Sequence, residues 1–146
     1  MLISDVLREK GNNVYTISPE ESVYKAISEL RDKHIGALVV VNGDENVIGM
    51  LSERDYANKV ILEGRSSKDT LVKEIMSSKV QFVTPNQSVE ECMALMTEKR
   101  FRHFPVLNDR HMVGIVSIGD LVKAIISKQK IEIDYLMNYI TGKYPV

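Results

Sequence analysis

The sequence has few of the residues that disulfides, cysteine metal clusters and nucleic-acid surfaces require. It contains a single cysteine among 146 residues, and its formal net charge is −1. One cysteine excludes an internal disulfide or a cysteine metal cluster within one chain. A net charge near zero lacks the basic excess with which nucleic-acid binders meet the phosphate backbone. We therefore expect neither a metal nor a nucleic acid among its ligands.

Long apolar runs are also missing. No stretch approaches the roughly 18 consecutive apolar residues of a membrane span. The segment Met1–Asp5 lacks the basic and apolar regions of a signal peptide. The remaining composition, 44% hydrophobic and 27% charged, is ordinary for a soluble globular domain. We expect a cytoplasmic protein with no membrane partner.

What the sequence does contain is an internal repeat. The segment Ile17–Val23 matches Val83–Val89, 66 residues later, with proline, serine and valine at the same places. A Ser-x-x-Asp motif closes each copy, at Ser52–Asp55 and at Ser117–Asp120. Two copies are too few for a solenoid, so we expect two supersecondary units that pack face to face around a pseudo-two-fold axis.

Each copy predicts the order strand, helix, strand, strand, helix. Ser88 is a candidate N-cap, followed by apolar residues at helical spacing, among which Cys92 fits a small core residue better than a reactive thiol. The apolar residues beyond Lys130 predict a terminal amphipathic helix that has no counterpart in the first copy. The strands expected in the second copy are Gln81–Val83, Phe104–Leu107 and Met112–Val116.

The expected fold class is α/β (α+β), in three segments. Residues 1–66 hold the first copy with its N-terminal segment, residues 67–130 hold the second copy, and residues 131–146 form a tail. The two copies are joined by the polar run Glu63–Asp69. The segments that precede the copies, Ile3–Leu7 and Val72–Met76, also resemble one another.

The Ser-x-x-Asp motif has two interpretations. It is nearly a capping box, in which the serine hydroxyl accepts from the backbone N–H three residues later and the carboxylate reaches back. The same geometry suits a nucleotide, because a helix N-terminus favours phosphate and a carboxylate can accept ribose hydroxyls. On local sequence alone the two interpretations stand about even.

Basic residues lie near each motif but are placed differently. Arg54 lies inside the first motif, whereas Arg102 and His103 precede a strand of the second copy. Arginine suits bidentate phosphate recognition, although a surface salt bridge is its commoner role. If His103 keeps its reference pKa, we expect binding near Asp120 to be the tighter of two and to weaken above about pH 6.5.

The doubled pattern resembles a tandem pair of CBS domains, the Bateman module, as found in small stand-alone bacterial proteins. The resemblance is carried by Gly49–Asp55 in the first copy and by Phe101–Val106 with Gly114–Asp120 in the second. It covers nearly the whole chain. It implies two pseudo-symmetric β-α-β-β-α repeats that bind adenosine compounds in two clefts and form a homodimer. The compounds are AMP, ADP, ATP or NAD, with S-adenosylmethionine ranked last.

The resemblance also implies which residues form each cleft. In one cleft Asp120 would bind ribose with Ser117 nearby, and Arg102 and His103 would face phosphate. The rest of this set is Val14, Tyr15, Thr16, Ile35, Gly36, Ala37, Phe101, Ile118 and Gly119. The second cleft would use Ser52, Arg54, Asp55, Val80, Gln81 and Phe82. Two departures from the family pattern are Gly36-Ala37 in place of a basic pair, and serine where threonine is frequent.

We therefore expect a non-catalytic adenine-nucleotide sensor that signals to an effector protein. One alternative is a structural dimerisation module with empty clefts. An enzyme is the other, and it is disfavoured because the three histidines lie at unrelated points of the repeat and Asp55 and Asp120 would face different clefts.

Overall fold

The computed structural model describes residues 1–142, which fall into two compact units. Residues Asn13–Phe82 form one, here called the Asp55 unit. Met1–Asn12 together with the chain from Val83 onwards form the other, the Asp120 unit. Each unit holds one Ser-x-x-Asp motif and a hydrophobic core of its own. The last four residues of the expected tail lie outside the described residues.

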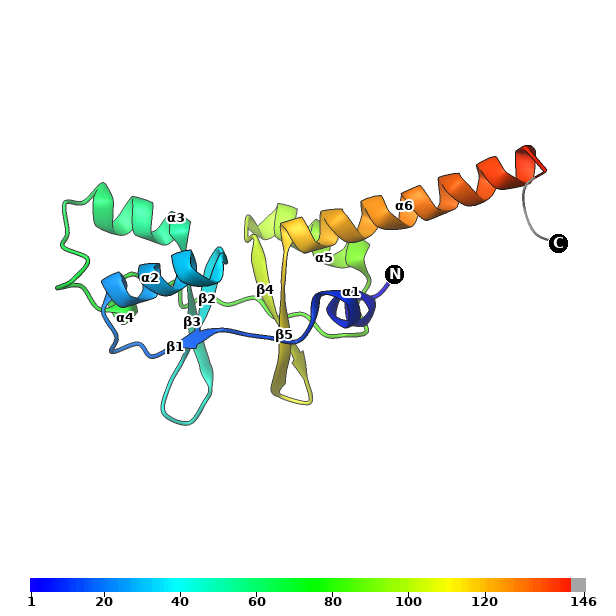
Figure 1. The fold of residues 1–146 in the computed structure, drawn as a ribbon. Coiled ribbons are helices and arrows are strands. Elements are labelled where there is room, and N and C mark those ends of the chain that lie inside the picture. The colour runs from blue at the N-terminus through cyan, green and yellow to red at the C-terminus, as the bar shows by residue number, and fades with distance from the viewer. Residues whose placement is uncertain (143–146) are drawn as a thin grey trace. The chain divides into compact units, whose positions relative to one another are not determined.

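The Asp55 unit is a three-stranded sheet with helices (Figure 1). Its strands are β1 (Thr16–Ile17), β2 (Ala37–Val41) and β3 (Val47–Ser52) in the order β1-β2-β3, with the first pair parallel and the second antiparallel. The helices are α2 (Val23–Lys33), α3 (Glu53–Tyr56), the π-helix η1 (Ala57–Ile61) and α4 (Val72–Ile75). β2 is buried along most of its length, which explains its unbroken run of apolar residues.

The Asp120 unit has a similar plan with one strand fewer. It contains α1 (Ile3–Lys10), α5 (Val89–Lys99), the antiparallel pair β4 (His103–Asn108) and β5 (His111–Ser117), and α6 (Ile118–Ile140). Ser88 caps α5 through its hydroxyl, as the sequence predicted. The core takes in Cys92, which is fully buried, and burial raises the pKa of its thiol to about 11. The interpretation of Cys92 as a core residue is thus confirmed.

The strand expected at Gln81–Val83 is reduced to Val83, which makes one isolated parallel bridge to Val106. The first copy explains the loss. There the Val39 N–H donates to the Tyr15 carbonyl at 3.2 Å and extends the ladder. The residue at the place of Val39 in the second copy is Pro105, which has no N–H to donate to Gln81.

The helix that precedes each sequence repeat belongs to the other repeat's unit. Before the first repeat, α1 joins the start of α5 through an Ile3–Gln87 backbone hydrogen bond of 2.9 Å. Before the second repeat, α4 joins the start of α2 through a Val72–Glu21 bond of 2.8 Å. Isolated bridges at Leu2–Ser88 and Leu71–Ser22 complete the two joins. The compact units therefore cut across the boundaries of the repeats.

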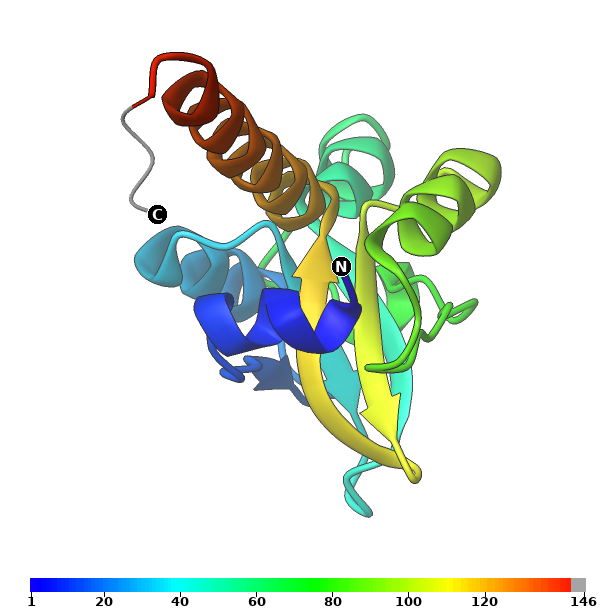
Figure 2. The ribbon, with the colours of Figure 1, turned by 90° about the vertical axis from the view of Figure 1, so that its right-hand side faces the viewer.

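α6 continues without a break through Lys130 to Ile140 (Figure 2). The helical tail is therefore confirmed as far as Ile140, but it is an extension of the final repeat helix and not a separate element. Beyond Ser127 its side chains are exposed. The exposed apolar residues on its outer part are Ile126, Ile131, Ile133, Tyr135, Leu136, Met137, Tyr139 and Ile140.

Candidate functional site

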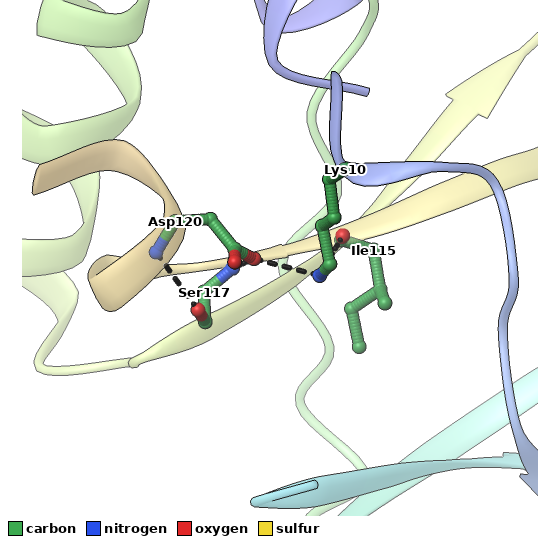
Figure 3. A network of polar contacts seen from close by, with 4 residues as sticks. All are labelled: Lys10, Ile115, Ser117 and Asp120. Carbon is green, nitrogen blue, oxygen red and sulfur yellow. Dashed lines mark hydrogen bonds and ion pairs between the residues drawn. The ribbon is translucent and has the colours of Figure 1, made fainter. Parts of the chain in front are cut away.

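Both Ser-x-x-Asp motifs lie at a point where a strand runs directly into a helix. At the β5–α6 junction, the Ser117 N–H donates to Asp120 Oδ2 at 2.8 Å, and the Asp120 N–H donates to Ser117 Oγ at 3.1 Å (Figure 3). At the β3–α3 junction, the Ser52 N–H and hydroxyl donate to Asp55 Oδ2 at 2.9 and 3.1 Å. Both capping boxes are complete. The capping interpretation is confirmed.

In each motif the cap uses only the Oδ2 atom of the carboxylate. Within residues 1–142, Asp120 Oδ1 accepts no hydrogen bond, and Asp55 Oδ1 meets only a lysine. The side chains of Asp120 and Asp55 are 24% and 17% exposed. Each carboxylate is therefore fixed in direction by the helix start and still presents an oxygen that can accept a further donor.

A lysine that the sequence analysis missed binds Asp120. Lys10, the last residue of α1, places its Nζ 2.6 Å from Asp120 Oδ2 and 2.7 Å from the Ile115 carbonyl oxygen (Figure 3). Burial of Asp120 acts to raise its pKa, but hydrogen bonds from Lys10 and Ser117 and the charge of Lys10 outweigh it, so the pKa is lowered. No sequence signal marks this pair, because 110 residues separate its members.

Asp55 has a lysine partner of a different origin. Lys59 lies four residues later, with its Nζ 3.2 Å from Asp55 Oδ1 and 3.0 Å from the Ile75 carbonyl oxygen. Its spacing of i, i+4 on a helix is a signal that the sequence analysis could have used. In both units a lysine thus bridges the motif carboxylate and a backbone carbonyl.

The structure brings Arg102 and His103 beside the Asp120 motif. The Arg102 carbonyl accepts from the Ile118 N–H at 2.9 Å, and His103 pairs with Ser117 across β4 and β5. The premise of an unperturbed His103 is wrong. Burial lowers its pKa, and the charges of Lys10 and Arg102 lower it further against the opposing effect of Asp120. His103 is therefore neutral at pH 7, and the expected loss of binding above about pH 6.5 has no basis.

The other residues expected near this motif occupy varied places. Phe101 packs edge to face on Phe104 with ring centroids 6.4 Å apart, and its side chain adjoins the core. Ile118 and Gly119 form the first turn of α6. Arg102 is exposed, and its side chain makes no ion pair within the described part of the chain.

The residues expected to hold adenine with Asp120 belong to the Asp55 unit. Gly36 and Ala37 lie beside the Asp55 motif, since the Gly36 carbonyl accepts from the Glu53 N–H at 3.3 Å and Ala37 pairs with Ser52. Tyr15 has Lys33 Nζ 4.5 Å from its ring centroid. Thr16 is in β1, and Val14 and Ile35 are half-buried beside strands.

The remaining residues expected around Asp55 lie on α3 and in the segment that follows α4. Arg54 is on the exposed side of α3, and within residues 1–142 it forms no ion pair. The half-buried segment that contains Gln81 is irregular, and no hydrogen bond within the described residues links it to the Asp55 motif. The members of that segment are Val80, Gln81 and Phe82.

A groove of about 590 Å³ runs between α1 and the first half of α6 within the Asp120 unit. Lys10 and Asp120 line one part of it, and Lys123 and Lys128 line another. The acidic residues along it are Asp5, Glu9 and Glu132. Within residues 1–142, no group of three or more histidine, cysteine or acidic side chains is arranged to hold a metal ion. The described helices include none that is long and apolar enough to cross a membrane.

Residues 3–61 and 72–127 each match the family model described as the CBS domain. The chain belongs to the CBS-domain family and carries two copies of the domain. Pairs of these domains are generally non-catalytic regulatory modules that bind adenosine ligands.

Similar proteins come from distant organisms. The CBS domain-containing protein CBSX3, mitochondrial, of Arabidopsis thaliana is 41% identical over 150 residues, which span 97% of this chain and 73% of that protein. YhcV of Bacillus subtilis is 34% identical over 120 residues, which span 82% and 84%. A solved CBS-domain structure from Burkholderia ambifaria is 49% identical, covers 88% of this chain and 96% of its own, and gives a TM-score of 0.85.

Proposed function

We propose that this chain is a non-catalytic sensor that binds an adenosine nucleotide at its Ser-x-x-Asp motifs and signals to an effector protein. The ligand is AMP, ADP, ATP or NAD in preference to S-adenosylmethionine. One observation carries the proposal: in both units a helix start fixes a partly exposed carboxylate, beside a lysine, with one oxygen not used by the cap.

The chemistry of this arrangement fits a nucleotide. A carboxylate oxygen accepts a ribose hydroxyl, and hydrogen bonds to charged groups contribute about 1.5–3 kcal/mol each. The neighbouring lysine offsets the repulsion between the carboxylate and a phosphate, and the helix N-terminus also favours the phosphate. The serines keep their hydroxyls in the caps, so the substitution of serine for threonine costs no donor.

The rival functions have less support. An enzyme would need a nucleophile with a base or a pair of acids at one place. The capping boxes use Asp55 and Asp120 one per unit, and His103 is neutral beside the second. An empty structural module would also use both carboxylates in its capping boxes, so only a binding measurement separates it from the sensor. Location in the cytoplasm stays a prediction.

A homodimer is part of the proposal. Leu30 on α2 and Met96 on α5 are buried in the cores of their own units and cannot form a dimer surface. The exposed candidates are on α6, where Ile126, Ile133 and Ile140 recur every seven residues and are 58–76% exposed. Isoleucines seven residues apart lie along one side of an exposed helix, which suits a surface that pairs with a second copy of itself.

The experiment is native mass spectrometry of protein purified without nucleotide, followed by calorimetry with AMP, ATP and NAD. We expect a dimer and retained or added nucleotide. The variants Asp55→Asn and Asp120→Asn should each weaken binding by about 1.5–3 kcal/mol at one motif, while the asparagine oxygen can still accept the capping hydrogen bond. Asp44→Asn, in an exposed turn, is the matched control. Unchanged binding in the double variant would leave the caps as purely structural, and a monomer at micromolar concentration would refute the dimer.

A further inference from the structure

We propose that Lys10 makes the Asp120 motif selective for phosphorylated adenosine ligands over uncharged adenosine. This inference rests on the proposed function, and it assigns a role to a residue outside both Ser-x-x-Asp motifs. Its basis is the contact between the end of α1 and the start of α6, shown in Figure 3.

The Lys10 ammonium is held in place before any ligand binds. Asp120 Oδ2 and the Ile115 carbonyl accept two of its hydrogen bonds, at 2.6 and 2.7 Å. A lysine ammonium carries three N–H donors, so one remains for a third acceptor. The Lys10 side chain is 32% exposed on the wall of the groove between α1 and α6. A ligand oxygen beside Asp120 therefore has a fixed, charged donor within reach.

The charge of Lys10 explains why it would favour a nucleotide over uncharged adenosine. A ribose bound to Asp120 brings the phosphate of a nucleotide close to a carboxylate, and the two negative charges repel each other. Lys10 neutralises the carboxylate and can also bind the phosphate with a charge-assisted hydrogen bond. Uncharged adenosine gains nothing from this neutralisation. Lys10 thus raises the affinity for the nucleotide and not for the nucleoside.

Other basic groups near Asp120 are less suited to the task. His103 is half-buried and neutral at pH 7, and Arg102 is exposed without an acceptor among the described residues. Lys123 and Lys128 line the groove but are not anchored by any acceptor in residues 1–142. Ordering a free lysine costs side-chain entropy, a cost that the anchored Lys10 has already met on folding.

The test uses AMP and adenosine as calorimetric probes in an Asp55→Asn background, which isolates the Asp120 motif. Lys10→Met should lower AMP affinity roughly tenfold or more, the loss expected of one charge-assisted hydrogen bond, and change adenosine affinity less than about twofold. Lys10→Arg should keep the preference for AMP. Lys99→Met, at an exposed lysine that ends α5 and does not line the groove, is the matched control and should leave the ratio unchanged.

Lys10→Gln serves as a second variant because it keeps a donor for Asp120 but removes the charge. It should lose AMP preference as Lys10→Met does, even if the methionine variant folds poorly. Equal losses of AMP and adenosine affinity would show that Lys10 only supports the fold. Tighter AMP binding without Lys10 would show that it competes with the ligand. If the parent protein binds neither probe, the proposed function fails, whereas an unchanged ratio in a protein that binds both refutes this inference alone.

Discussion

The two motifs have the same backbone cap but obtain their positive charge from different places. Asp55 takes Lys59 from η1, the π-helix that directly follows α3, whereas Asp120 takes Lys10 from the far end of the sequence. The electrostatics at Asp55 are therefore local, and those at Asp120 depend on the packing of α1. A duplicated fold can keep its geometry while its two sites come to depend on different parts of the chain.

The largest difference between the two units is expected when alanine replaces a strand glycine in each. Gly49 of β3 contacts the residues after α4, and Gly114 of β5 contacts α1. A Cβ on Gly49 would lie 2.9 Å from the Ser77 carbonyl oxygen, which is itself held by the Met50 N–H. A Cβ on Gly114 would lie closest to the methyl groups of the Leu7 side chain, at 2.7 and 3.0 Å, and these can rotate away. Gly49→Ala should therefore cost about 1–3 kcal/mol of unfolding free energy, and Gly114→Ala less.

Urea unfolding of the two variants and of Gly43→Ala measures this difference. Gly43 has open space around it and is the control for added side-chain bulk. A larger loss at Gly114 than at Gly49 would contradict the account, because it would mean that Leu7 is held more rigidly than a backbone carbonyl.

Removal of the capping hydroxyls should give a smaller, unequal effect. Ser117→Ala removes the acceptor for the Asp120 N–H, a change that typically costs about 1 kcal/mol. Ser52→Ala removes the acceptor for Asp55 and also the hydroxyl bond to Asp55 Oδ2, so we expect the greater loss there. Thermal unfolding of both variants would show which one loses more stability. Ser→Thr at each site is the control that keeps the hydroxyl. Equal losses would mean that the extra bond at Ser52 contributes nothing.

The smallest expected effect is the acid sensitivity of the Asp120 contact. The pKa of Asp120 is lowered in the folded state, because the hydrogen bonds and charge of Lys10 outweigh burial, so the contact stabilises the protein fully above the unfolded value of about 3.9. That stabilisation is lost as the pH falls through the folded-state pKa. Urea unfolding between about pH 5 and pH 3 should show a steeper decline for the parent protein than for Asp120→Asn. Parallel curves would show that Lys10 does not hold the carboxylate ionised.

Local features of the fold could be read from the sequence because short-range rules determine them. The capping boxes, the hairpin turn after Asn108 and the helix that Ser88 begins all follow from neighbouring residues. The missing strand near Gln81 was also readable, since Pro105 has no N–H for the ladder, but only once the parallel pairing in the first copy is known.

The features that escaped prediction depend on distant contacts. The Lys10–Asp120 pair joins residues 110 positions apart, and no periodicity links them. The prediction that His103 keeps its reference pKa was wrong for a similar reason. Burial lowers this pKa, and burial depends on the folded unit and not on neighbouring residues. The continuity of α6 was missed since the loss of repeat symmetry after Lys130 was read as a boundary, although no helix-breaking residue lies there.

Because the leading helices are exchanged, each half of the chain supplies one helix to the unit that the other half mainly forms. A cut in the linker after Ser66 would leave one fragment with α1 but without α4, and the other with α4 but without α1. Neither fragment would then hold all the pieces of either unit. Each would carry the part that completes its counterpart, so the two should regain structure only when mixed, as the halves of a split reporter do.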